Sequence, residues 1–148
     1  MSSLRKIFLL LLILPIISCA GTGTKNFSSI KKKPNDQSSS LFFVRALKYI
    51  AGGVNSEILV DSNSIGILAS NEMIRYDVEP GSHIITTKGH GMNAIGIRNY
   101  DKRVNIKKSE NLYFEINYNA ELFSGYFDII KMSEKNWMFR KDKFDKSK

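Results

Sequence analysis

Short β-prone runs separated by turn residues dominate the chain from residue 41 onward. The spacing is close to the roughly 8–12 residues typical of β-sandwiches and barrels. The runs expected to form strands are 41–50, 57–61, 64–68, 73–78, 82–88, 102–106, 112–118 and 126–132. A helical turn is expected only around Ser133–Phe139, where Ser133 can cap the turn and Trp137 can pack against a sheet. We therefore predict an all-β fold, a small antiparallel β-sandwich with a short C-terminal helical turn.

The segment 112–118 gives the clearest strand pattern. Its apolar residues recur at every second position, which places Phe114 on one face and Glu115 on the other. We expect Phe114 to lie in the core. Glu115 is expected to face away from it and to tolerate substitution.

Turn residues predict how neighbouring strands are joined. Ser62-Asn63 lies between two runs and predicts a tight hairpin in which Asn63 takes a positive φ. Pro80 and Gly81 predict a chain reversal, because Pro fixes its own φ and Gly accepts positive φ. Gly66, inside a strand run, indicates a bulge or a close backbone approach.

The first nineteen residues have the pattern of an export signal. A short basic start precedes an apolar run over Ile7–Ile17, and small residues follow. The run is shorter than the ~20 residues that a helix needs to cross a bilayer. Its ending, Ile16-Ile17-Ser18-Cys19, resembles a bacterial lipobox. The resemblance implies that residues 1–18 are removed and that Cys19 becomes an acylated N-terminus; an ordinary cleaved signal peptide and an uncleaved apolar anchor are the alternatives.

Cysteine usage agrees with lipid attachment. Cys19 is the only cysteine in the chain, so no intrachain disulfide can form. Acyl chains on Cys19 would anchor the protein stably to membrane lipid. These features predict a lipid-anchored protein of the bacterial cell envelope. Ala20, in place of the Asp that retains such proteins in the inner membrane, favours the outer membrane, facing the periplasm.

The net charge of +8 lies outside the predicted fold. Residues 20–40 and 140–148 each carry +3, the export signal carries +2, and residues 41–139 are neutral. A nucleic-acid-binding domain needs a basic face on the fold itself, so we exclude nucleic acid as a partner. Residues 19–40, small and polar, are expected to form a lipidated, flexible basic tether. Residues 41–139 are expected to form the sandwich and 140–148 a basic tail.

Several short motifs resemble those of a known family. They are Leu41–Arg45, Ile58–Asp61 with Ile65–Leu68, Tyr76–His83 and Asn111–Phe114. In this order they resemble the DUF2846 family of bacterial lipoproteins and the related PEGA-type β-domains, over about residues 41–132. The resemblance implies a compact antiparallel sandwich without established enzyme activity, with His83 as a structural group beside the Pro80-Gly81 turn. Ser62 stands where the family has a hairpin glycine, and Glu110-Asn111 replaces a second glycine.

Residues able to support catalysis are few. The chain has two histidines, His83 and His90, which together with Cys19 do not reach the three or four ligands of a zinc site. A Gly-x-Ser-x-Gly nucleophile motif is absent from the sequence. We therefore predict no enzyme activity, cofactor or metal. The alternative is a small hydrolase or metal-dependent enzyme that uses His83 or His90 with nearby carboxylates.

Binding is the favoured function. The segment 89–100 is long, polar and broken by glycine, as functional loops often are. We expect a non-catalytic binding or spacing module whose partner is another envelope protein or a cell-wall polymer. The residues expected to contact a ligand are His90, Met92, Asn93 and Tyr100.

Overall fold

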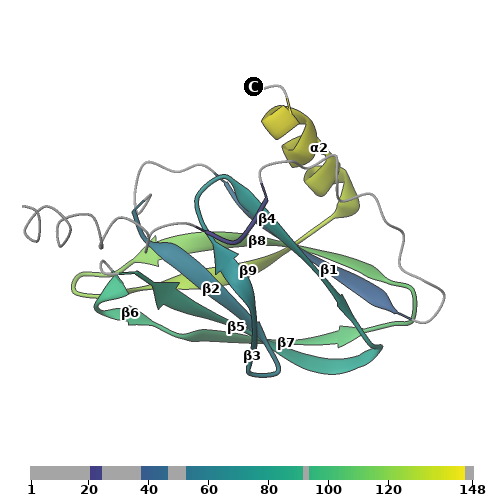
Figure 1. Ribbon diagram of the computed structural model, residues 1–148, viewed down its shortest axis with the longest axis horizontal. Coiled ribbons are helices and arrows are strands. Elements are labelled where there is room, and N and C mark those ends of the chain that lie inside the picture. Colours follow the sequence, from purple (N-terminus) through teal and green to yellow (C-terminus); the bar gives the residue numbers. More distant parts are fainter. Residues whose placement is uncertain (1–20, 25–37, 47–52, 92–93, 146–148) are drawn as a thin grey trace, which may run out of the picture.

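Two β-sheets pack face to face, and a helix lies on the outer side of one of them (Figure 1). The computed structural model describes residues 21–24, 38–46, 53–91 and 94–145. The predicted all-β sandwich with a short C-terminal helix is confirmed.

The five-stranded sheet has the order β4-β1-β8-β9-β6 and the four-stranded sheet the order β3-β2-β5-β7. Most neighbours are antiparallel, but β1 runs parallel to β8 and β6 runs parallel to β9. The five-stranded sheet contains β4 (Glu72–Val78), β1 (Ser39–Arg45), β8 (Asn111–Ala120), β9 (Gly125–Met132) and β6 (Ile97–Arg98). The four-stranded sheet contains β3 (Asn63–Leu68), β2 (Asn55–Val60), β5 (Gly81–His90) and β7 (Tyr100–Ile106).

The core lies between the two sheets and follows the predicted alternation. Phe114 is fully buried, and its ring stacks on that of Phe43 with centroids 5.5 Å apart. Phe127 comes from β9, and Ile58 and Ile85 come from the opposite sheet; all three are fully buried too. The prediction that Phe114 faces the core is therefore confirmed.

The helix α2 (Glu134–Asp145) covers the outer face of the five-stranded sheet. Ser133 caps it, because its hydroxyl accepts a hydrogen bond from the Asn136 amide. Trp137 is buried, with its ring 5.5 Å from that of Phe42 and 5.1 Å from that of Tyr113. The helix continues to Asp145 and so includes six residues of the segment expected to be a basic tail.

Two predicted turns differ from expectation. In the β2–β3 hairpin Val60 pairs with Asn63, so the two loop residues are Asp61 and Ser62. These two, and not Asn63, have the positive φ values that such a two-residue turn requires. Pro80 lies between β4 and β5, which belong to different sheets. This turn is therefore a corner between layers and not a hairpin.

Residues 21–24, which we call the N-terminal strap, pair with one edge of each sheet. The Thr22 amide donates to the Ile67 carbonyl of β3 at 2.7 Å. Thr24 exchanges two backbone hydrogen bonds with Met73 of β4, at 2.8 and 3.0 Å. Part of the segment expected to be a flexible tether is thus bound to the sandwich; residues 25–37 lie outside the described residues.

Gly66 makes room for the strap. It has a φ of 150°, and the β2–β3 register shifts beside it, so the predicted bulge is present. A Cβ at this position would lie 2.7 Å from the Thr22 hydroxyl. The expected close backbone approach is therefore made by the strap itself.

Truncation of Phe114 should test the core. We expect Phe114→Ala to lower the free energy of unfolding by about 3–5 kcal/mol, because it leaves a cavity in a closed core. Urea denaturation followed by the fluorescence of Trp137, the sole tryptophan, measures this loss. Phe139→Ala is the matched control: the residue is 70% exposed, and we expect a change within about 0.5 kcal/mol. Equal losses in the two variants would contradict the register.

Candidate functional site

His83 is held by two partners at the corner between the sheets. Its Nδ1 lies 2.6 Å from a carboxylate oxygen of Asp61, and its Nε2 lies 2.9 Å from the carbonyl oxygen of Glu79. A bond to a backbone carbonyl is the partner expected of a structural histidine. Both ring nitrogens therefore face hydrogen-bond acceptors within the fold.

Asp61 connects the β2–β3 turn to β5. One of its carboxylate oxygens accepts the amide of Ile84 at 2.9 Å, and the other contacts His83. These two hydrogen bonds, first that from Ile84 and then that from His83, lower the pKa of Asp61 below its usual value of 3.8. The Asp61 side chain therefore supports the turn in its ionised form.

Of the four residues predicted to contact a ligand, the structure describes His90 and Tyr100. Met92 and Asn93 lie outside the described residues. His90 ends β5, where it pairs with Asn55 of β2. Tyr100 begins β7, and its ring stacks on that of Tyr126 with centroids 5.4 Å apart. Burial, followed by the nearby Asp128 carboxylate, raises the pKa of Tyr100, so its hydroxyl stays protonated at neutral pH.

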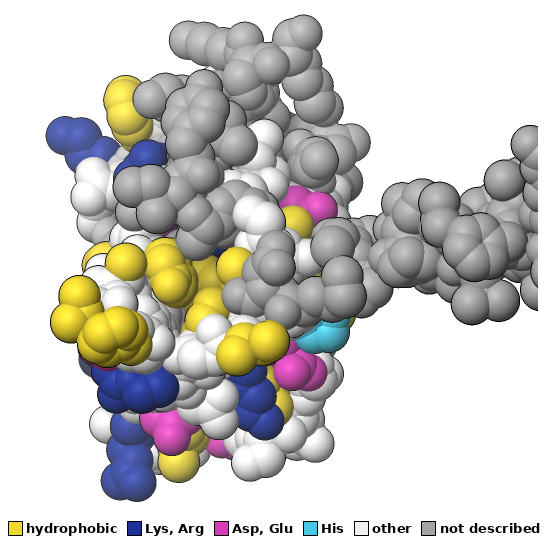
Figure 2. Space-filling view, turned by 90° about the vertical axis from the view of Figure 1, so that its left-hand side faces the viewer, with side chains coloured by type: hydrophobic (Ala, Val, Ile, Leu, Met, Phe, Trp, Pro, Cys, Tyr) yellow, Lys and Arg dark blue, Asp and Glu magenta, His cyan; other side chains and the backbone are white. Residues whose placement is uncertain are grey.

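The same end of the sandwich carries the most exposed large apolar side chains of the described residues. Ile95, between β5 and β6, is 94% exposed. Leu122 and Phe123, in the β8–β9 turn, are 87% and 91% exposed. We call these three residues the apolar tip. Figure 2 looks onto this end and shows hydrophobic side chains gathered there with Lys and Arg nearby. The segment 89–100, singled out from the sequence, contains Ile95. The sequence analysis missed Leu122 and Phe123, two adjacent large apolar residues inside a polar turn.

The backbone of the tip is held by polar contacts. Arg98 pairs with Glu121 and also lies over the ring of Tyr126, 5.5 Å from its centroid. The Glu121 amide donates to the Ser124 carbonyl at 2.9 Å, which closes the β8–β9 turn. The hydrogen bond from the Ser124 hydroxyl, and then Arg98, lower the pKa of Glu121. Leu122 and Phe123 therefore project from a turn that a hydrogen bond and an ion pair hold in place.

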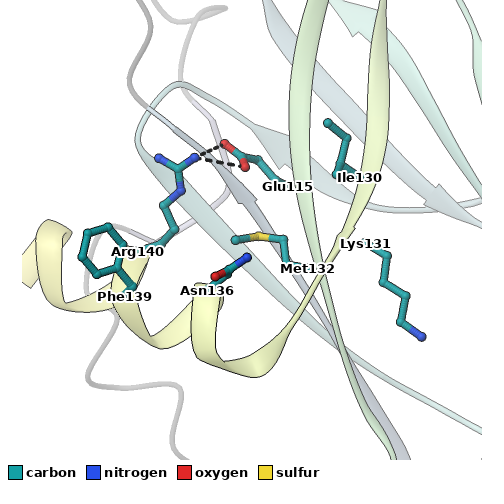
Figure 3. A pocket seen from close by; sticks show the side chains of 7 residues that line it. All are labelled: Glu115, Ile130, Lys131, Met132, Asn136, Phe139 and Arg140. Atoms are coloured by element: carbon teal, nitrogen blue, oxygen red, sulfur yellow. Dashed lines mark hydrogen bonds and ion pairs between the residues drawn. The ribbon is translucent and has the colours of Figure 1, made fainter.

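A pocket of about 380 Å³ lies on the other side of the five-stranded sheet, between α2 and the outer faces of β8 and β9 (Figure 3). Its lining residues are Glu115, Ile130, Lys131, Met132, Asn136, Phe139 and Arg140. One Arg140 nitrogen donates to both oxygens of Glu115, at 3.0 and 3.2 Å. Lys131 points away from this ion pair (Figure 3).

Glu115 has a more enclosed position than its expected tolerance of substitution implies. It does face away from the core, as the alternation requires, but α2 covers that face and leaves Glu115 only 8% exposed. Truncation of a carboxylate in this position would strip Arg140 of its partner. The pair attaches α2 to the sheet and therefore has a structural role. Because Glu115 and Arg140 neutralise each other, neither charge is free in that part of the pocket.

Neither metal ligands nor a spanning helix occurs in the described part of the chain. Within residues 21–24, 38–46, 53–91 and 94–145, no three His, Cys, Asp or Glu side chains gather closely enough to hold a metal ion. In the same residues no helix is long and apolar enough to cross a membrane. Cys19 lies outside them.

No protein-family model matches the chain, and a search of the curated proteins finds no relative. The function must therefore be argued from the sequence and the geometry.

The Asp61 contacts predict a pH-dependent stability. The folded-state pKa of Asp61 is below 3.8. The contribution of its ionised side chain to the free energy of unfolding is therefore complete well above that pH, and it is lost as the pH falls through the folded-state pKa. We expect Asp61→Asn to lower the urea midpoint near neutral pH, and this difference from the wild type should shrink as the pH falls below 3.8. Asp77→Asn, which leaves the β2–β3 turn intact, is the comparison. A difference that does not change with pH would contradict the assigned role.

Proposed function

We propose that this chain is a lipid-anchored protein of the bacterial cell envelope whose β-sandwich is a non-catalytic binding or spacing module. The observation that carries the proposal is the sequence Ile16-Ile17-Ser18-Cys19, which ends an apolar run and contains the sole cysteine. Acylation of Cys19 would attach the protein to membrane lipid. Ala20 favours the outer membrane, facing the periplasm.

The environment of the histidine at the corner between the sheets supports a non-catalytic role. A general base needs a ring nitrogen within reach of its substrate. Both ring nitrogens of His83 are instead directed at Asp61 and Glu79. The resemblance to DUF2846-type lipoproteins points in the same direction, because it accounts for Pro80, Gly81 and His83 as parts of a turn.

The anchor has a direct test. The intact mass of the mature protein, purified from membranes of an expressing bacterium, should correspond to a chain that begins at Cys19 with added lipid. Cys19→Ser should prevent acylation and leave the uncleaved precursor held by its apolar segment. Ser18→Ala, which keeps a small residue before the cysteine, should be processed normally. A mature wild-type chain that begins elsewhere and carries no lipid would overturn the proposal.

A further inference from the structure

The strap and the apolar tip lie at the same end of the sandwich. The strand register shows this: Arg45 pairs with Glu72, and Asn55 pairs with His90. In the five-stranded sheet the C-terminal end of β1 also runs toward the β8–β9 turn, since β1 and β8 are parallel. The β3–β4 turn, the segment after His90 and the β8–β9 turn therefore share one end.

Gly21, the first described residue, is at this end. A Cβ on Gly21 would lie 2.7 Å from the Cβ of Ala69 in the β3–β4 turn. Cys19 precedes Gly21 by two residues, and two extended residues span at most about 7 Å. An acyl group on Cys19 must therefore emerge close to the end that carries the tip.

The proposed lipid anchor and the apolar tip thus point to one surface. We infer that this end of the sandwich faces the lipid bilayer, and that Ile95, Leu122 and Phe123 insert into it beside the acyl chains of Cys19. This inference rests on the proposed function. It goes further because it fixes which part of the sandwich meets the membrane.

The composition of the tip fits a bilayer. Its three side chains are almost fully exposed, as side chains that enter a lipid phase must be. Behind them stand the stacked rings of Tyr100 and Tyr126, with Arg98 over the latter. Apolar side chains in front of tyrosine and arginine match the order from acyl chains to headgroups in a membrane interface.

The dimensions are compatible with simultaneous contact. Val44 pairs with Glu115, which sets the end of β1 beside Ile116, and β8 continues from there to Ala120. At about 3.3 Å per residue the end of β8 lies ~13 Å past the start of β4. Cys19 can make up about 7 Å of this difference. A moderate tilt of the sandwich brings the anchor and the tip to one membrane plane.

Lipid-phase quenching tests the inference on the full mature protein. Leu122→Cys and Lys108→Cys each provide one free thiol when Cys19 is acylated, and both are labelled with an environment-sensitive nitrobenzoxadiazole dye. Lys108 is the control, because it is exposed in the β7–β8 turn at the opposite end. The labelled proteins are reconstituted in vesicles of phosphatidylethanolamine and phosphatidylglycerol with and without nitroxide-bearing lipid.

Nitroxide lipid should quench the label at position 122 several-fold more strongly than the label at position 108. Equal quenching, or stronger quenching at position 108, would overturn the inference. Weak quenching at position 122 together with protection from aqueous iodide would also overturn it, since it would indicate a protein partner on the tip. Intact mass of the same samples reports lipid on Cys19, so a missing anchor is recognised separately as a failure of the proposed function.

Discussion

Burial of β1 on both of its faces is the constraint on which the rest of the structure depends. All seven of its residues are buried. A strand in this position needs a layer on each side. The four-stranded sheet covers the side of Phe43, and α2 covers the side of Phe42 through Trp137. The helix is therefore part of the fold, and the Glu115–Arg140 pair holds its middle to the sheet.

Arg45, at the end of β1, joins the two layers. Its guanidinium lies over the ring of Phe127 in its own sheet and donates to the carbonyls of Val54 and Leu68 on the other side. Burial lowers the pKa of Arg45 to about 10, so the side chain stays charged at neutral pH. The strap then covers the edges of β3 and β4 beside this end, where unpaired backbone groups would otherwise be open to pairing with another chain.

The sequence was sufficient for every strand of the described residues except β6. It was also sufficient for the positions of the turns at Ser62 and Pro80, but not for their geometry. Alternation in 112–118 and the turn residues at Ser62 and Pro80 reflect local steric preferences, which short segments carry by themselves. Local sequence does not predict which strands pair. A turn such as Pro80-Gly81 does not reveal whether the next strand returns to the same sheet. The charged residues after Phe139 suggested a solvated tail. The contact that holds Arg140 comes from Glu115 of β8, which is distant in the sequence, so the local composition does not reveal it.

The candidate site was predictable only in part. The segment 89–100 drew attention because glycine and polar residues mark a loop, and Ile95 lies in it. Leu122 and Phe123 lie beside it only because β6 pairs with β9, Ile97 with Gly125, and composition does not reveal this pairing. The strap escaped prediction for another reason: its small polar residues bury little apolar surface, and backbone hydrogen bonds retain it at Ile67 and Met73.

Docking of the strap is the central claim, since it brings the anchor to a defined end of the sandwich. Hydrogen exchange of the mature protein tests it most directly at the amides of Thr22, Thr24 and Met73. The account predicts slow exchange at all three. It also predicts that Gly23→Val, whose Cβ would lie 3.0 Å from the Met73 carbonyl oxygen, accelerates exchange there and leaves Phe114 protected. Exchange of Thr22 and Thr24 at the rate of an unstructured chain, in a protein whose Phe114 amide is protected, would contradict it.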